Sequence, residues 1–502
     1  MSNQRMSDQP PRRPTPTRWA SARHPFIYEI NTWPWVTGLS ASAGTPVDLS
    51  TVPDEHWDAI ADFGFDAVWL MGVWQRSPAG AAVALANRDL VAECLAALPD
   101  WTPQDVVGSP FCIRNYEVDE YLGGRAGLAA ARSALAGRGL ALILDFVPNH
   151  VAPDHPWTSK HPEYFVSGTS AELVADPESF MDVNGTVLAN GRDPNFPAWS
   201  DVLQLNAFSR GLRHEIADTL RDVASQCDGV RCDMAMLVMN DVFARTWGDR
   251  VGDPPEGEYW PEAIDAVRQD HPDFRFIAES YWDREWPLQQ QGFDFCYDKG
   301  LYDRLVTGDA AAVRDHLRAD ADFQSRLLRF VENHDESRAA AILDPARQEA
   351  VTLATLTQTG ARLVHHGQLT GARVRLPVFL GRHPREDIDH ELASFHRALL
   401  KALCDSTFRA GTWMLCETVE LVSWCWDGDH RWLIVVNLSA EHVADHVRVP
   451  WNDVTDGVHR LVDPITGVEW VRSGREVRDG LYVELGPWQW HLFKVARTDP
   501  HP

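Results

Sequence analysis

The sequence predicts an α/β fold, a (β/α)8 barrel, with an all-β region after it. Short, almost continuous apolar runs recur along the chain with helical patterns between them, which is typical of a parallel sheet covered by helices. Several runs end on an acidic residue, and a barrel of this kind holds its chemistry at the C-terminal ends of its strands. Such runs are Leu140–Leu144 before Asp145, Phe274–Ala278 before Glu279 and Leu327–Val331 before Glu332.

The stretch Gly229–Asp233 is the most informative of these runs. The apolar residues that lead into it predict a strand, and a strand does not usually bury two charges without a purpose. Residues two apart on a strand point to the same side. Arg231 and Asp233 are therefore expected to project together at the C-terminal end of this strand.

The remaining strands and helices follow from the same patterns. Pro53 and Asp54 are start signals for the helix that follows them. Apolar residues recur at helical spacing from Leu212 onward, which predicts a strongly amphipathic helix over Ser209–Cys227. Asn31, Trp33 and Trp35 are expected in a loop. The other expected strands are Phe26–Ile30, Phe65–Leu70, Leu140–Asp145, Arg275–Glu279, Gly292–Tyr297, Leu327–Val331 and Ala361–Val364; the other expected helices are His56–Phe63, Leu85–Leu98, Gly127–Gly137, Glu262–Gln269, Ala310–Ala319, Pro345–Thr357 and Glu391–Leu403.

Four segments resemble the signature segments of the α-amylase family, glycoside hydrolase family 13. They are DFVPNH (Asp145–His150), GVRCD (Gly229–Asp233), FIAES (Phe276–Ser280) and FVENHD (Phe330–Asp335), and they occur in the family's order. The resemblance covers roughly Phe26 to Gly371 and implies a small domain after the third strand and a C-terminal β-sandwich. We therefore expect a disordered tail at 1–24, the barrel at 25–150 and 207–408, the inserted domain at 151–206 and the sandwich at 409–502.

The resemblance implies a role for each motif carboxylate. Asp233 matches the nucleophile, Glu279 the general acid/base, and Asp335 a carboxylate that grips hydroxyls of the distorted sugar. Asp145 matches a residue that orients Arg231. Two carboxyls are what glycosidic cleavage needs, about 5–5.5 Å apart in retaining enzymes and about 6.5–9.5 Å apart in inverting ones. Adjacent strands lie about 4.8 Å apart, which favours the retaining arrangement.

Local sequence agrees with these two principal roles. Arg231 beside Asp233 is expected to keep that carboxyl ionised. The apolar setting of Glu279 is expected to raise its pKa, so that it carries a proton near neutral pH. The alternative is that Asp233 and Glu279 are members of a structural ion-pair network.

The remaining site residues are implied by the resemblance alone. His150 and His334 match two histidines that donate to the same sugar, and Phe111 falls where the family has a Tyr that stacks on it. The alternative is that Phe111 is only a packed loop residue without contact to a sugar. Asn149 matches a position that ligates a structural Ca²⁺ in many members, but six to eight oxygen ligands are needed and the others are not identified, so no cofactor is expected to be required.

One departure concerns the substrate. Many starch-cleaving members carry Lys and His where this chain has Met236 and Leu237. This difference argues against a typical endo-acting α-amylase but not against cleavage of α-glycosidic bonds. Hydrolysis, glycosyl transfer and phosphorolysis share this site. A non-catalytic carbohydrate-binding member of the fold is the alternative from another class, since fold does not fix function.

Composition narrows the partners and the compartment. The formal net charge of −26 argues against nucleic acid or an anionic membrane as partner and suits a neutral carbohydrate. The eight Cys show no metal-ligand spacing and are expected to be buried free thiols of a reducing compartment. No apolar run reaches about 18 residues, and the polar N-terminus has no secretory h-region, so we expect a cytoplasmic protein.

Overall fold

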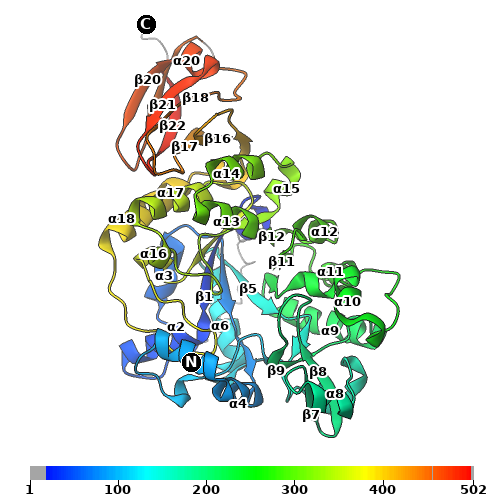
Figure 1. Ribbon diagram of the computed structural model, residues 1–502. Helices are drawn as coiled ribbons and strands as arrows, with labels where there is room; N and C mark the ends of the chain where they lie inside the picture. Colours follow the sequence, from blue (N-terminus) through cyan, green and yellow to red (C-terminus); the bar gives the residue numbers. More distant parts are fainter. Residues whose placement is uncertain (1–17, 455, 499–502) are drawn as a thin grey trace, which may run out of the picture.

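A closed barrel of eight parallel strands forms the centre of the molecule. The structure is a computed structural model that describes residues 18–454 and 456–498. Neighbouring strands follow the order β1, β2, β5, β10, β11, β12, β13 and β14 around the barrel, and helices surround it (Figure 1). The strands are β1 Phe26–Asn31, β2 Ala67–Met71, β5 Ala141–Phe146, β10 Gly229–Cys232, β11 Arg275–Ala278, β12 Phe295–Tyr297, β13 Leu327–Arg329 and β14 Ala361–His365.

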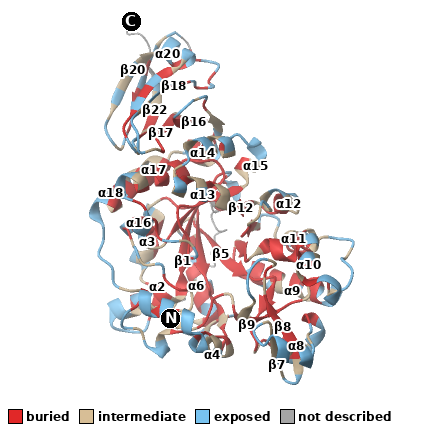
Figure 2. Cartoon of the chain, viewed as in Figure 1, coloured by how far each residue is buried: buried red, intermediate tan, exposed pale blue. Residues whose placement is uncertain are grey.

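The barrel strands are buried along almost their whole length (Figure 2). This explains why the sequence shows them as continuous apolar runs rather than as alternating patterns. Helix α9 shows the complementary helical pattern, with Leu212, Ile216, Leu220 and Val223 buried. The helices around the barrel are α3 Asp54–Asp62, α6 Gly124–Ala136, α9 Arg210–Gln226, α10 Asn240–Trp247, α11 Tyr259–Arg268, α12 Glu285–Gln290, α13 Lys299–Thr307, α14 Ala310–Leu317, α15 Ala321–Ser325, α16 Ala339–Ile342, α17 Pro345–Leu356 and α18 His390–Leu403.

Two local predictions were wrong. The expected loop after β1 is helix α2, Thr32–Ala43. Pro34 lies in its first turn, where a proline is tolerated, and Trp35 is buried against the barrel. The helix expected over Leu85–Leu98 is two helices, α4 Pro78–Ala86 and α5 Arg88–Ala97. The side chain of Asn87 accepts hydrogen bonds from the Asp89 and Leu90 amides and so caps α5.

The prediction of a disordered tail over residues 1–24 was wrong for residues 18–24. Residues 1–17 lie outside the described residues, but α1, Arg18–Ser21, is a helical turn on the barrel. Trp19 is buried, its indole donates to the Asp228 carbonyl, and the Arg275 guanidinium lies 4.9 Å from its ring centre. Residues 18–24 therefore belong to the folded barrel and not to a disordered tail.

Two insertions stand at the C-terminal end of the barrel strands. The one after β2 holds α4, α5 and the hairpin β3 Trp74–Arg76 and β4 Ile113–Val118. The one after β5 is the expected small domain, whose sheet has the order β6, β9, β8, β7. Its elements are β6 His150–Val151, α7 Trp157–Lys160, α8 Ser170–Ala175, β7 Phe180–Val183, β8 Thr186–Gly191 and β9 Trp199–Gln204.

The C-terminal domain is the expected all-β structure, with a six-stranded and a two-stranded antiparallel sheet. It lies beside α14 and α17 (Figure 1). The indoles of Trp424 and Trp426 both donate to the Thr357 carbonyl, just after α17, at 3.1 and 2.8 Å. Its elements are β15 Thr412–Leu415, β16 Val422–Asp427, β17 Arg431–Val436, β18 Val443–Val447, β19 Val458–Val462, β20 Glu469–Ser473, α20 Gly474–Asp479, β21 Leu481–Leu485 and β22 Trp490–Thr498, and α19 Thr407–Ala410 precedes it.

The cysteines agree with the prediction at seven of eight positions. All eight are free thiols, but Cys404, at the end of α18, is exposed where a buried thiol was expected. Over the described residues, no helix combines the length and the apolarity that a membrane crossing requires.

Candidate active site

Asp233 and Glu279 directly follow two neighbouring barrel strands. Cys232 of β10 pairs with Ala278 of β11, so the two acids that follow stand at the same level. The Glu279 amide donates to the Cys232 carbonyl at 3.0 Å, which fixes this register beyond the strands. The structure thus places the two carboxylates side by side at the C-terminal end of the barrel, as the sequence predicted.

Arg231 bridges these two carboxylates. Its Nη1 lies 2.7 Å from Asp233 Oδ1, and its Nη2 lies 2.7 Å from Glu279 Oε2. The guanidinium is buried and lies 5.0 Å from the ring centre of Phe111 and 5.4 Å from that of Trp69. A planar, permanently charged fork can hold two carboxylates in fixed orientations, which a flexible ammonium cannot do.

Glu279 has two differently bonded oxygens. Oε2 accepts from the Met234 amide at 2.6 Å, in addition to its contact with Arg231. Oε1 accepts from the Tyr281 hydroxyl at 2.9 Å. Burial raises the pKa of Glu279 to about 7 against the opposing charge of Arg231. This carboxyl can therefore hold a proton near neutral pH, as expected for a general acid.

The backbone around Glu279 is bent to make these contacts. Met234 has φ 43°, and the consecutive residues Trp282 and Asp283 have φ 60° and 58°. Left-handed conformations are costly for such side chains, and they cluster at functional sites. The turn at Met234 directs its amide at Glu279, and the turn at Trp282 follows immediately on Tyr281.

Asp233 has the charged neighbour that the sequence predicted, and two opposing effects act on its pKa. The ion pair with Arg231 is present, yet burial outweighs it and the pKa of Asp233 rises above its ordinary value. The nearby Asp335 charge adds to that rise. Arg231 thus limits the rise and does not produce a lowered pKa.

Asp335 and His334 form a second charged pair at the mouth of the site. Asp335 Oδ2 lies 3.0 Å from His334 Nε2, and the side chain of Asp335 is 42% exposed. Desolvation opposes ionisation of Asp335, but the His334 charge outweighs it and lowers the pKa of Asp335 to about 2. Asp335 is thus an ionised, reachable carboxylate, which suits a residue that grips hydroxyl groups.

Asp145 is bonded differently from the prediction. Its carboxylate accepts from the Trp69 indole at 3.1 Å and from the Gly72 amide at 2.6 Å, and it forms no ion pair with Arg231. It lies opposite Arg231 in the strand register. Burial raises the pKa of Asp145 to about 6, although the Arg231 charge opposes this. Asp145 therefore fixes the end of β2 and acts on Arg231 only through its charge.

His150 and Asn149 are both buried beside the inserted domain. His150 contacts the Trp199 ring edge to face, and burial lowers its pKa to about 3, so it is a neutral imidazole. The Asn149 carboxamide is paired with that of Gln204: Nε2 of Gln204 donates to Oδ1 of Asn149 at 2.9 Å.

Asn149 does not fit a calcium ligand in this arrangement. Its amide oxygen already accepts from Gln204, and the described residues contain no cluster of three or more His, Cys, Asp or Glu suited to a metal ion. Ca²⁺ requires six to eight oxygen ligands.

Phe111 lies in the site, whereas Met236 and Leu237 do not. The Phe111 ring is partly buried and lies 5.4 Å from the His334 ring, in addition to its contact with Arg231. Met236 and Leu237 are 0% and 2% exposed. Both side chains are packed in the core and cannot contact a leaving sugar.

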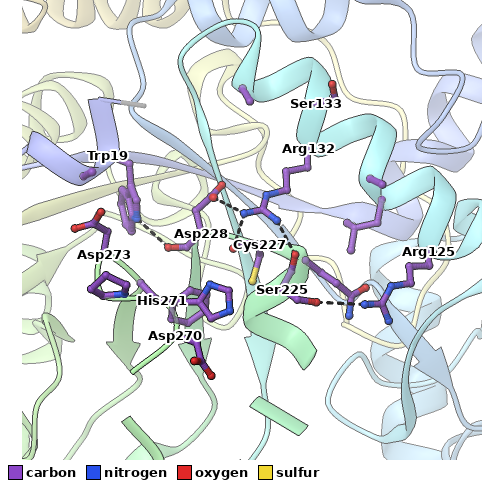
Figure 3. A pocket seen from close by; sticks show the side chains of 17 residues that line it. Trp19, Arg125, Arg132, Ser133, Ser225, Cys227, Asp228, Asp270, His271 and Asp273 are labelled. Carbon is purple, nitrogen blue, oxygen red and sulfur yellow. Dashed lines mark hydrogen bonds and ion pairs between the residues drawn. The ribbon is translucent and has the colours of Figure 1, made fainter. Parts of the chain in front are cut away.

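A cavity of about 750 Å³ lies at the other end of the barrel. Asp228 and Phe274, which precede β10 and β11, help to line it. Arg132 also lines it, and its guanidinium is paired with Asp228 (Figure 3), at 2.7 Å. The cavity is therefore separate from the carboxylates, which follow the same two strands.

Three residues of the site were not found from the sequence: Glu29, Trp69 and Tyr281. Glu29 and Trp69 lie on β1 and β2 within apolar runs, and only the closure of the barrel brings them to the site. Tyr281 stands two residues after Glu279, and that spacing on an extended chain was a usable signal.

Comparison with known proteins supports the resemblance drawn from the four motifs. No protein-family model matches the chain. The chain is 26% identical over 405 residues to the α-amylase MalA of Haloarcula japonica. The aligned region covers 77% of this chain and 49% of that protein. It is 28% identical over 210 residues to an α-1,4-glucan:maltose-1-phosphate maltosyltransferase of Mycolicibacterium smegmatis, covering 38% of this chain and 24% of that protein.

A solved structure shows the same fold. The crystal structure of a maltogenic α-amylase from Thermotoga neapolitana superimposes with a TM-score of 0.67 at 20% identity, covering 94% of this chain and 98% of that one. The matched region spans about half the length of the Haloarcula japonica α-amylase and about a quarter of the maltosyltransferase. The comparisons thus confirm the likeness to α-amylases in sequence and in fold.

Proposed function

We propose that this relative of the α-amylases is a retaining enzyme that cleaves α-glucosidic bonds in an α-glucan, an oligosaccharide or a small α-glucoside. The observation that carries the proposal is the pair Asp233 and Glu279, held on the two terminal nitrogens of one buried guanidinium. Neighbouring strands set carboxyl groups at about the spacing of a retaining pair.

In the first step the Asp233 carboxylate attacks the anomeric carbon while Glu279 gives its proton to the departing oxygen. The pKa of about 7 suits Glu279 to carry that proton. The products are a glycosyl ester of Asp233 and the free leaving group. In the second step ionised Glu279 takes a proton from water, which attacks the ester and restores Asp233.

The other side chains position the sugar. Asp335 accepts from its hydroxyls, His150 and His334 contact the same ring, and Phe111 offers a ring face. The reaction uses only carboxyl chemistry, so we propose that no cofactor or metal is required. The free thiols support a reducing compartment, and we propose the cytoplasm.

Glycosyl transfer is the second candidate. The likeness to the maltosyltransferase favours it, and the buried Met236 and Leu237 give no support to endo-acting starch cleavage. In a transferase a sugar hydroxyl or phosphate replaces water in the second step. The site residues keep the same roles.

Product analysis by NMR tests both candidates. Wild type and Asp233→Ala are compared on α-glucosides, maltooligosaccharides and sucrose, each with and without phosphate. Release of an α-anomer by wild type alone supports the hydrolase. Longer oligosaccharides or a sugar phosphate favour the transferase, and the absence of turnover on the whole panel contradicts both in favour of a binding protein.

A further inference from the structure

Glu29 is a buried carboxylate for which the proposed mechanism has no role. It lies on β1, is 0% exposed and faces Trp69 and His365 in the strand register. Its Oε1 lies 2.5 Å from His334 Nδ1. Its Oε2 accepts no hydrogen bond from any described group. Burial of a carboxylate in this way is costly unless a partner of opposite charge compensates it.

His334 is held on several sides. The Trp69 ring meets it edge to face at 5.5 Å, and the Phe111 ring lies 5.4 Å away, so the imidazole cannot turn freely. Nδ1 is directed at Glu29, and Nε2 lies 3.0 Å from Asp335 Oδ2. The contact of Nε2 is an ion pair without hydrogen-bond geometry, and no described group accepts a hydrogen bond from this nitrogen.

We propose that Glu29 is a positioning residue that keeps His334 doubly protonated, so that its Nε2–H remains a donor to the sugar hydroxyl that Asp335 accepts from; this rests on the proposed function. A neutral imidazole has only one N–H. If that proton were on Nδ1, toward Glu29, then Nε2 would direct its lone pair at the Asp335 carboxylate, which repels it. Only the imidazolium satisfies both carboxylates.

The charges around His334 favour the cation. Burial works against it, but the Asp335 and Glu29 charges outweigh burial and raise the pKa of His334 well above its ordinary value. The facing groups from other strands are Asp145 on β5, Arg231 on β10, Asp233 just after β10 and His365 on β14. Two of these four are carboxylates, Arg231 opposes them, and burial keeps His365 neutral by lowering its pKa.

The contrast with His150 shows what Glu29 adds. His150 is as buried as His334, but its partners are neutral: its Nδ1 lies 3.3 Å from the Asn149 carboxamide nitrogen, and the ring has a hydrogen bond with the Phe111 backbone. Burial outweighs that bond and lowers the pKa of His150 to about 3. The two site histidines thus differ in protonation state because one faces carboxylates and the other faces an amide. A neutral donor and a charged donor on one sugar ring distinguish its hydroxyls.

Glu29→Gln tests the proposal, because it keeps the size of the side chain and an acceptor oxygen but removes the charge. Imidazole NMR of ¹³C- and ¹⁵N-labelled protein follows the His334 titration, assigned by the signal lost in His334→Gln. We expect wild-type His334 to stay protonated through neutral pH and to titrate at lower pH in Glu29→Gln. An unchanged titration overturns the proposal, and so does a neutral wild-type His334 at pH 7, which needs no variant.

Turnover gives the second readout. Above the lowered pKa of His334, Glu29→Gln is expected to lose about 10- to 100-fold in kcat/KM relative to wild type, the loss expected for a hydrogen bond to a charged group. Below that pKa most of the activity should return, which a merely structural defect would not produce. A uniform loss at every pH overturns the positioning role.

Asp463→Asn is the matched control. Asp463 is a buried carboxylate 3.7 Å from His491 Nδ1 in the C-terminal domain, far from the site in the fold. This variant should leave both the His334 titration and the turnover unchanged. The NMR titration needs no substrate, so a failure of the proposed function, seen as no turnover by wild type, is distinguishable from a failure of this inference.

Discussion

Tyr281→Phe removes one hydrogen bond from the proposed general acid and little else. The Tyr281 hydroxyl donates to Glu279 Oε1 at 2.9 Å, whereas the Met234 amide and Arg231 both serve Oε2. When Glu279 is protonated, the proton therefore belongs on Oε1. The phenol stabilises the ionised carboxylate more than the neutral acid, so its removal should raise the pKa of Glu279.

The size of the change follows from hydrogen-bond energies. A bond to a charged group contributes about 1.5–3 kcal/mol and a bond between neutral groups about 0.5–1.5 kcal/mol. The difference, about 1–1.5 kcal/mol, corresponds to about one pH unit. The first step needs protonated Glu279, so kcat/KM falls above its pKa of about 7 in wild type. In Tyr281→Phe that basic limb should lie near pH 8.

The assay is kcat/KM against pH on an α-glucoside with a poor leaving group. A glucoside of a strongly acidic phenol serves as the control, because its departure needs no proton and its profile should lack the limb in both proteins. An unmoved limb on the poor leaving group, in a variant whose denaturation midpoint matches wild type, would refute this account of Tyr281.

Four further outcomes are expected. Glu279→Gln should lower kcat/KM by about 10²- to 10⁴-fold on poor leaving groups and far less on the acidic-phenol glucoside; an equal loss on both would contradict the acid role. Phe111→Ala should raise KM by about 2- to 10-fold, whereas Phe111→Tyr should not, if ring stacking contributes about 0.5–1.5 kcal/mol; equal KM values in the two variants exclude stacking. Trp424→Ala should cost about 3–5 kcal/mol in urea unfolding; a loss under 1 kcal/mol would mean that the indole is not part of the core. Treatment with a chelator should leave both turnover and melting temperature unchanged, because Asn149 is occupied by Gln204; a loss that Ca²⁺ restores would show a metal site.

The sequence predicted those parts of the site that lie within one strand and its end. Asp233 and Glu279 each close a buried run, so a local pattern was enough to find them. The register between β10 and β11 then brought them together as expected. Buried runs also predicted the barrel, because a parallel strand covered on both sides needs apolar residues at every position.

Contacts between distant strands could not be predicted in the same way. Glu29 and His334 are 305 residues apart, and their pairing depends on the closure of the whole barrel. The direction of the Asp233 pKa also depended on burial, which competes with the Arg231 charge and has no local sequence signal. Helix α2 was missed because its aromatic and Pro residues favour a helix only weakly without the barrel surface beneath them.

The two indoles that share the Thr357 carbonyl have a consequence for protein engineering. This carbonyl lies in the short turn between α17 and β14, the last barrel strand, so the C-terminal domain holds the seam at which the barrel closes. A chain truncated after α18 would expose the apolar surface around that seam and leave the carbonyl without its donors. The sandwich is thus part of the packing that holds the barrel closed, and exchanging it for that of a relative would require Trp424 and Trp426 to be carried over with it.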